Sequence, residues 1–231
     1  MREIVFDTET TGLDHKTGDR MVEIGCIEMV NRVATGRTFH AYYNPDRDMP
    51  AAAEAVHGLS AAFLSDKPRF HEQVDELLAF IGDAPLVAHN ASFDFGFLNA
   101  ELEIAGREPV SLDRMVDTIA IAKRRHPGAK LTLDALCTRY GIDRSHRIKH
   151  GALLDAELLA QLYVELTGGR QIGLELAAGD VGGGDDSALG MPARPERRRE
   201  FRPPRPHSAS EEELARHRAF IGRMDEAIWN S

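Results

Sequence analysis

Cysteine is scarce in this chain and long apolar runs are missing. Two cysteines, Cys26 and Cys137, occur among 231 residues, both in apolar stretches; this is typical of buried thiols in a reducing compartment and excludes a disulfide-dependent fold. No apolar run approaches the roughly 18–20 residues that a membrane-spanning helix requires. A secretory signal is also missing, because polar Asp7-Thr8-Glu9 follow only three apolar residues. We therefore expect a soluble cytoplasmic protein.

Positive charge is also in deficit. The formal net charge is -9, which argues against a protein that coats nucleic acid passively. Residues 123–150 differ, because eight Lys and Arg residues there stand against Asp134 and Asp143, for a local net charge of +6. A solvated surface is the simpler explanation of this basic stretch. A surface that meets nucleic-acid phosphates is the alternative.

The composition changes near Thr167-Gly168-Gly169, and this change predicts a domain boundary at residue 168. Residues 169–209 are rich in glycine and then in proline and arginine, so they bury too little apolar surface to fold and we expect a flexible linker. Ser210-Glu211-Glu212-Glu213 is a capping-box pattern, and apolar residues follow at helical spacing, which predicts a helix within 210–231. A single amphipathic helix has nothing of its own to pack against, so we expect it to dock on either the main domain or a partner.

Residues 1–168 have the pattern of one α/β domain. We expect strands at 3–6, 21–30, 37–43 and 86–88, the first three as an antiparallel meander in which the second and third strands are joined through Asn31 and the Gly36 turn region. We expect helices near 50–56, 71–81, 93–105, 117–125, 132–140 and 151–166. Strands that are first paired and then interleaved with helices predict a mixed sheet with flanking helices.

Two carboxylates, Asp7 and Glu9, stand at the end of the first expected strand. Positions i and i+2 of a strand share one face, so both side chains project together. Like charges this close raise each other's pKa unless a cation neutralises them, and hard oxygen ligands favour Mg²⁺ or Mn²⁺. Because Asp-x-Glu is common by chance, an ordinary acidic loop is the alternative.

Two further carboxylates and a histidine strengthen the metal hypothesis. Asp94 follows strand 86–88, where a helix begins. Asp155 stands among leucines on the last expected helix, where an Asp is costly to bury unless it is paired or metal-bound; a boundary position facing solvent is the alternative. His150 stands at the start of that helix, where it can reach the same site, or else it is a surface histidine. Four carboxylates and one histidine suit two-metal phosphodiester hydrolysis, with the histidine taking a proton from the attacking water.

At these residues a family resemblance emerges. Asp7-Thr8-Glu9-Thr10-Thr11-Gly12, His89-Asn90-Ala91-Ser92-Phe93-Asp94 and His150-x-x-x-x-Asp155-Ala156 resemble, in this order, the three motifs of the DEDDh 3′–5′ exonucleases over roughly residues 1–168. The resemblance implies a ribonuclease H-like exonuclease fold and two divalent ions, Mg²⁺ or Mn²⁺, per active site. It implies Asp7, Glu9 and Asp155 as metal ligands that also contact the substrate, His150 as general base, and Asp94 as a catalytic residue that helps the second metal, directly or through water.

A narrower resemblance is to the epsilon, or proofreading, subunits of bacterial DNA polymerase III. It rests on His150-Gly151-Ala152-Leu153-Leu154-Asp155-Ala156, Val56-His57-Gly58-Leu59 and Leu166-Thr167-Gly168-Gly169. It implies that His57 binds substrate near the terminal nucleotide. Relatives often carry an acidic residue a few positions earlier, but alanines fill most of that stretch here, and Glu54 is assigned no such contact.

The end of the chain adds two expected partners. Gln171-Ile172-Gly173-Leu174-Glu175-Leu176 is similar to the short motif that binds the beta sliding clamp, with Gln171, Leu174 and Leu176 as pocket residues; a chance match is the alternative. The terminal helix with Trp229 resembles the segment by which epsilon subunits attach to the alpha (polymerase) subunit; a self-packed helix is the alternative. A small accessory subunit is a further partner to consider.

These observations predict a proofreading 3′–5′ exonuclease that acts on the 3′ end of single-stranded or mispaired DNA, with the basic stretch guiding phosphates to the acidic cluster. One alternative is an RNA-trimming member of the same superfamily, although such relatives generally lack a linker and docking helix. Another is a non-catalytic tether between polymerase and clamp, which the complete set of five catalytic-type residues disfavours. We expect a bacterial cytoplasmic protein, associated with the nucleoid during replication and not with a membrane.

Overall fold

The structure, a computed structural model, describes residues 1–145, 147, 149–168 and 208–223. They fall into two units, one within Met1–Ala178 and the other within Gly179–Ser231. The clamp-like motif 171–176, most of the expected linker and Trp229 lie outside the described residues. Nothing in the described parts of the chain forms a helix with both the length and the apolar character to span a membrane.

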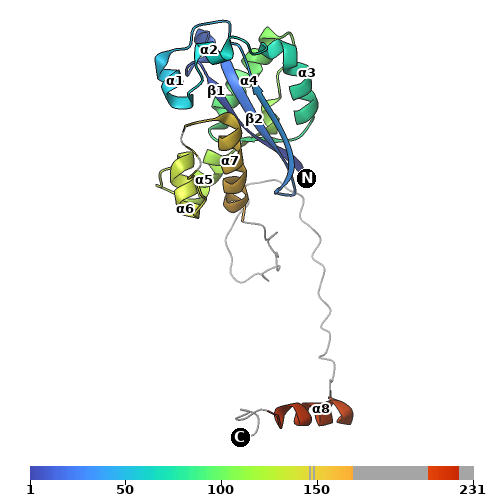
Figure 1. The fold of residues 1–231 in the computed structure, drawn as a ribbon. Coiled ribbons are helices and arrows are strands. Elements are labelled where there is room, and N and C mark those ends of the chain that lie inside the picture. Colours follow the sequence, from blue (N-terminus) through green and yellow to red (C-terminus); the bar gives the residue numbers. More distant parts are fainter. Residues whose placement is uncertain (146, 148, 169–207, 224–231) are drawn as a thin grey trace, which may run out of the picture. The chain divides into compact units, whose positions relative to one another are not determined.

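A mixed sheet of five strands organises the described part of the first unit (Figure 1). The strands are β1 (Arg2–Thr10), β2 (Met21–Val30), β3 (Val33–Tyr42), β4 (Leu86–Ala88) and β5 (Met115–Asp117), in the order β3-β2-β1-β4-β5. The first three are antiparallel, whereas β4 runs parallel to β1 and β5 parallel to β4. The mixed sheet with an antiparallel meander is therefore confirmed.

Helices cover both faces of this sheet. One core packs α3 (Phe70–Ile81) and α4 (Ala91–Ile104) against strand residues such as Ile4 and Phe6. The other packs α5 (Thr118–Arg125), α6 (Leu133–Tyr140) and α7 (Ala152–Leu166) against residues such as Val5, and Figure 1 shows these three helices together. Since strand residues alternate between faces, Asp7 and Glu9 lie on the same face as Val5, beneath α7.

Three differences from the expected elements have local causes. The β2–β3 turn includes Asn31, as expected, and Arg32, with φ of 51° and 65°. Two adjacent residues of positive φ are typical of a type I′ hairpin, so β3 begins at Val33, before Gly36. Helix α4 begins at Ala91 because Asn90, at φ 65°, closes the turn after β4. Strand β5 and helix α2 (Ala61–Leu64) were not expected, since three or four residues are too few to show a period.

The remaining short elements connect these layers. Helix α1 (Ala51–His57) precedes α2, and two 3-10 turns occupy His15–Thr17 and Leu112–Arg114. In the second unit the described residues form α8 (Glu211–Ile221). The Ser210 side chain accepts a hydrogen bond from the Glu213 backbone, and the Glu213 carboxylate accepts one from the Ser210 backbone. The predicted capping box is confirmed.

Candidate active site

The carboxylates of Asp7 and Glu9 are held by the interior strand of the sheet. In β1, Asp7 pairs with Gly25 of β2, and Glu9 pairs with Glu23. A Cβ on Gly25 would lie 2.3 Å from the backbone of Leu153 in α7, so only glycine lets the first turn of α7 rest directly on β2. This close approach brings Asp155, two residues later in α7, over the face that carries Asp7 and Glu9.

Asp94 reaches the same site from the opposite layer. It lies in the first turn of α4 and is 2% exposed. One of its oxygens accepts hydrogen bonds from the backbone N–H of Thr8 at 3.1 Å and from the Thr8 hydroxyl at 2.8 Å. Thr8 thus orients Asp94 from between the two strand carboxylates.

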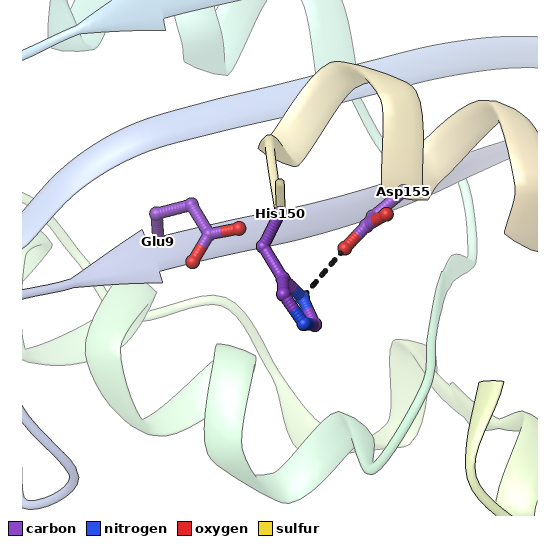
Figure 2. Close-up of side chains that lie close together, drawn as sticks. All are labelled: Glu9, His150 and Asp155. Atoms are coloured by element: carbon purple, nitrogen blue, oxygen red, sulfur yellow. Dashed lines mark hydrogen bonds and ion pairs between the residues drawn. The ribbon is translucent and has the colours of Figure 1, made fainter. Parts of the chain in front are cut away.

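Asp155 and His150 complete the set of predicted residues (Figure 2). Asp155 is 3% exposed in the first turn of α7, so the solvent-facing alternative is wrong. His150 precedes Gly151, the N-cap of α7, and its Nδ1 lies 3.1 Å from an Asp155 oxygen. Glu9, His150 and Asp155 each offer a ligand atom, and these atoms lie within 4.8 Å of one another.

One cleft of about 510 Å³ contains all five predicted catalytic-type residues. Its lining includes Asp7, Glu9, Asp94, His150 and Asp155, together with Asn90, Phe93 and Arg147. The three sequence motifs, which are far apart along the chain, therefore meet at one place.

His57 is not among the residues that line this cleft. Its side chain is buried and accepts a hydrogen bond from the backbone. It is 6% exposed, and its Nδ1 accepts a hydrogen bond from the backbone of Leu59 at 3.0 Å. Burial lowers its pKa below the usual value. The next residue back, Val56, accepts a hydrogen bond from the His150 backbone at 3.3 Å, so the end of α1 adjoins the His150 segment.

Sequence reasoning missed Arg147, which had been grouped with the basic stretch. Its guanidinium forms two hydrogen bonds to Asp155, at 2.5 and 2.6 Å, and an ion pair of 2.6 Å with Asp134. The side chain is only 9% exposed. Its position three residues before His150 was a sign that Arg147 lies near the site. No helical or strand periodicity indicated which way its side chain points.

The electrostatics of the site raise the pKa of three of its carboxyl groups, those of Asp7, Glu9 and Asp94. Burial, and then the nearby Asp94, Glu9 and Asp155, raise the pKa of Asp7 well above its ordinary value. Burial and Asp155 raise the pKa of Glu9 to about 8. Burial raises that of Asp94 to about 7. Buried carboxyl groups that repel one another and have raised pKa values are typical of functional sites.

The donor set fits divalent metal. Buried carboxylate oxygens that repel one another are stabilised in the charged form by a cation, and hard oxygen ligands suit Mg²⁺ or Mn²⁺ better than soft metals. The imidazole beside them adds a nitrogen ligand or a base. The arrangement can therefore activate water toward a phosphodiester.

The fold and this cleft define an exonuclease. Residues 4–163 match the exonuclease (RNase_T) family, and the chain belongs to it. Exonuclease X, solved with 5′ overhanging duplex DNA, is 25% identical with a TM-score of 0.56, and the match covers 71% of this chain and 90% of that one. A structure of exonuclease I is 16% identical with a TM-score of 0.61 over 72% of this chain and 40% of that one, which shows the fold alone.

Closer relatives narrow the family. The DNA polymerase III epsilon subunit of Rickettsia felis is 56% identical over 174 residues, covering 74% of this chain and 76% of that protein. The epsilon subunit of Escherichia coli K12 is 46% identical over 176 residues, covering 73% and 72%. The chain therefore belongs to the epsilon subunits of DNA polymerase III and is a proofreading 3′–5′ exonuclease. Family membership and the donor set imply dependence on divalent metal.

Proposed function

We propose that Asp7, Glu9 and Asp155 bind two divalent ions, Mg²⁺ or Mn²⁺, and that Asp94 helps to hold the second one, directly or through water. The observation that carries this proposal is the meeting of four carboxylates and His150 in one cleft. When bound, two such ions would stabilise charge on the attacking and leaving oxygens of the phosphodiester.

The residues around these ligands have separate tasks. His150, whose side chain is 47% exposed, takes the proton from the attacking water, and its position on a loop lets it turn toward that water. Thr8 fixes the carboxyl group of Asp94 through its backbone and its hydroxyl. The burial of Glu9, Asp94 and Asp155 strengthens the attraction of these carboxylates for cations.

The proposed substrate is the 3′ end of single-stranded or mispaired DNA. A mispaired end costs less to unpair, so it enters a single-strand site more readily than a matched end, and no base-specific contact is required. We assign His57 to the neighbourhood of the terminal nucleotide, because the end of α1 adjoins the segment that carries His150.

The proposed assembly is with DNA polymerase III in the bacterial cytoplasm, at the nucleoid during replication. We assign residues 1–168 to the exonuclease domain, 169–209 to a linker, and 210–231 to attachment to the alpha subunit. Gln171, Leu174 and Leu176 are assigned to the beta clamp, and a small accessory subunit is a further partner. Two short tethers on one chain raise the local concentration of the nuclease at the primer end.

Digestion of 3′-labelled strands tests the activity. We expect stepwise loss of DNA from the 3′ end, faster at a mismatch, supported by Mg²⁺ or Mn²⁺ and stopped by EDTA. A strong preference for the matching RNA strand would move the protein to the RNA-trimming branch. No cleavage of either strand would leave the tether between polymerase and clamp as the better explanation.

Deletion of residues 171–231 tests the assembly. Activity on free oligonucleotides should remain, because all five catalytic-type residues precede the deletion, whereas association with the polymerase and clamp should be lost. Loss of the nuclease activity as well would show that the deleted segment belongs to the catalytic fold.

A further inference from the structure

Arg147 makes a set of contacts that the proposed reaction does not use. Its Nε and Nη2 atoms donate to the two oxygens of Asp155, and Nη1 lies 2.6 Å from an oxygen of Asp134 on α6. This two-point geometry is the strongest that arginine forms with a carboxylate. Arg147, which lines the cleft, thus joins α6 to α7.

The same contacts occupy the groups that a metal and a base would need. Both oxygens of Asp155 accept from the guanidinium, so a divalent ion that binds Asp155 competes with these hydrogen bonds and with the positive charge beside them. The Nδ1 atom of His150 lies 2.6 Å from Arg147 Nη2, which can only donate, and 3.1 Å from an oxygen of Asp155, which can only accept when charged. Nδ1 is therefore held between these two side chains and is not available to a water molecule.

The charge balance explains why the guanidinium lies there. Asp155 is buried and contributes to raising the pKa of both Asp7 and Glu9. Arg147 has the opposite effect on both groups. A positive charge at this position stabilises the folded protein, and either a guanidinium or a divalent ion can provide it.

The contacts that hold Arg147 and His150 lie outside the sheet. In the connection from α6 to α7, the Arg147 backbone donates to Arg144 at 2.9 Å, and the His150 backbone donates to Val56 of α1 at 3.3 Å. Because Arg147 and His150 are three residues apart on this connection, the position of one constrains the other.

We propose that Arg147 is a positioning residue that acts as an internal counter-ion. In the metal-free protein its guanidinium neutralises Asp155 and restrains His150, and it leaves Asp155 when a divalent ion binds there. Metal loading thereby releases the base, so an unloaded site holds its base in an unproductive contact. The inference rests on the proposed role of Asp155 as a metal ligand.

Titration of Mn²⁺ into the metal-free full chain, without DNA and followed by calorimetry, tests this role. Arg147→Gln should bind Mn²⁺ about tenfold more tightly than the unaltered protein, the factor that corresponds to ~1.4 kcal/mol, because the ion no longer displaces a guanidinium. Arg147→Lys keeps the positive charge but cannot form the two-point contact with Asp155, so its Mn²⁺ affinity should lie between those of Arg147→Gln and the unaltered protein. Arg144→Gln is the matched control, since Arg144 also pairs with Asp134 and should leave the affinity unchanged.

Thermal unfolding supplies the second readout. In EDTA, Arg147→Gln should unfold at a lower temperature, because Asp155 is left unpaired among other carboxylates, and saturating Mn²⁺ should remove the difference. The proposal requires both changes. Weaker or unchanged Mn²⁺ binding in Arg147→Gln would overturn it, as would unaltered stability in EDTA; the Arg147→Lys variant gives the same test if the glutamine variant does not fold.

A separate variant distinguishes the failure of this inference from the failure of the proposed site. Asp155→Asn should lose at least one Mn²⁺ site whatever Arg147 does. If Asp155→Asn binds Mn²⁺ as the unaltered protein does, Asp155 is not a ligand and both proposals fall. If Asp155→Asn loses Mn²⁺ but Arg147→Gln gains nothing, the site stands and the counter-ion role alone is overturned.

Discussion

The strand that carries Asp7 and Glu9 and the loop that carries Arg147 and His150 contribute to one cleft in different ways. β1 is paired along its length with β2, and its residues Ile4 and Val5 are paired with β4 on the other side. The directions of Asp7 and Glu9 are therefore set by an extended backbone that is paired with β2. In the connection from α6 to α7, Arg144, Arg147 and His150 form side-chain ion pairs, of which those of Arg147 are the most buried.

This difference matches what each group has to do. Like charges repel and would separate on a flexible segment, so carboxylates that must stay together benefit from a backbone that cannot relax. A base must approach water and later release its proton, and a counter-ion must be able to leave, so both benefit from a loop. The comparison predicts different consequences for substitutions on the strand and on the loop.

The largest expected effect is on the strand. Asp7→Ala should reduce nuclease activity by roughly 10³-fold or more, since a metal contact supplies several kcal/mol of transition-state stabilisation. The fold should be retained, and stability in EDTA should not fall, because a repelling carboxylate is removed. Digestion of 3′-labelled DNA and thermal unfolding measure the two effects.

Glu3→Gln is the matched control for the strand. Glu3 lies on the same strand and face but accepts a hydrogen bond from Tyr163 at 2.7 Å, and it stands about 13 Å from Asp7 at ~3.3 Å per residue. The Glu3→Gln variant should lose about 1 kcal/mol of unfolding free energy and keep its nuclease activity. A fully active Asp7→Ala protein would refute the site assignment.

On the loop, the expected loss is smaller and of another kind. His150→Gln should lower kcat by roughly 10²–10⁴-fold, the contribution of a general base, with little change in Mn²⁺ affinity. Steady-state kinetics measures the change in kcat, and calorimetry on the same protein measures the change in Mn²⁺ affinity. Because possible ligand atoms of His150, Glu9 and Asp155 lie within 4.8 Å of one another, a marked loss of Mn²⁺ binding would make His150 a ligand and not a base.

The acidic cluster also predicts how stability depends on pH. Folding raises the pKa of Glu9 from 4.5 to about 8, so between these values the folded protein holds more protons than the unfolded chain and loses stability as pH rises. In EDTA the melting temperature should therefore fall across this range, by ~2–4 °C for each kcal/mol. Saturating Mg²⁺ should reduce the slope, because the cation stabilises the charged carboxylates.

Glu9→Gln provides the check on this pH dependence. It removes the titrating group but keeps the size of the side chain, so the fall in melting temperature with pH should become smaller. A melting temperature that is flat or rises with pH in the unaltered metal-free protein would contradict the raised pKa.

The strand half of the site was predictable from the sequence, and the loop half only in part. The two-residue period of a strand places Asp7 and Glu9 on one face whatever the rest of the chain does, and the apolar surroundings of Asp155 indicate that it is buried. Proximity to the helix start made His150 a candidate. No comparable rule gives the direction of Arg147, because its partners Asp134 and Asp155 belong to two helices whose packing decides it.

The basic stretch shows the same limit. A run of positive charge indicates a surface for phosphates only if its side chains face solvent together. In the structure, Arg144 and Arg147 pair with Asp134, and Arg125 donates to the carbonyl oxygens of Glu165 and Leu166 at 2.9 and 2.6 Å. Local net charge therefore overstates the number of cations available for DNA.

The smallest expected effect separates two neighbours in that stretch. Arg125 caps the C-terminal carbonyls of α7, where a cation also interacts favourably with the helix dipole, so Arg125→Gln should lower stability by about 0.5–1 kcal/mol and leave the salt dependence of DNA binding unchanged. Arg124→Gln should leave stability unchanged and, if the basic stretch meets phosphates, reduce the salt slope by about one. Denaturant unfolding and DNA binding at several salt concentrations measure both. If Arg125→Gln instead reduces the salt slope of DNA binding and leaves stability unchanged, Arg125 contacts phosphate and does not cap α7. A side chain that is engaged with the carbonyl oxygens of α7 makes no phosphate contact, so its removal would not change that slope.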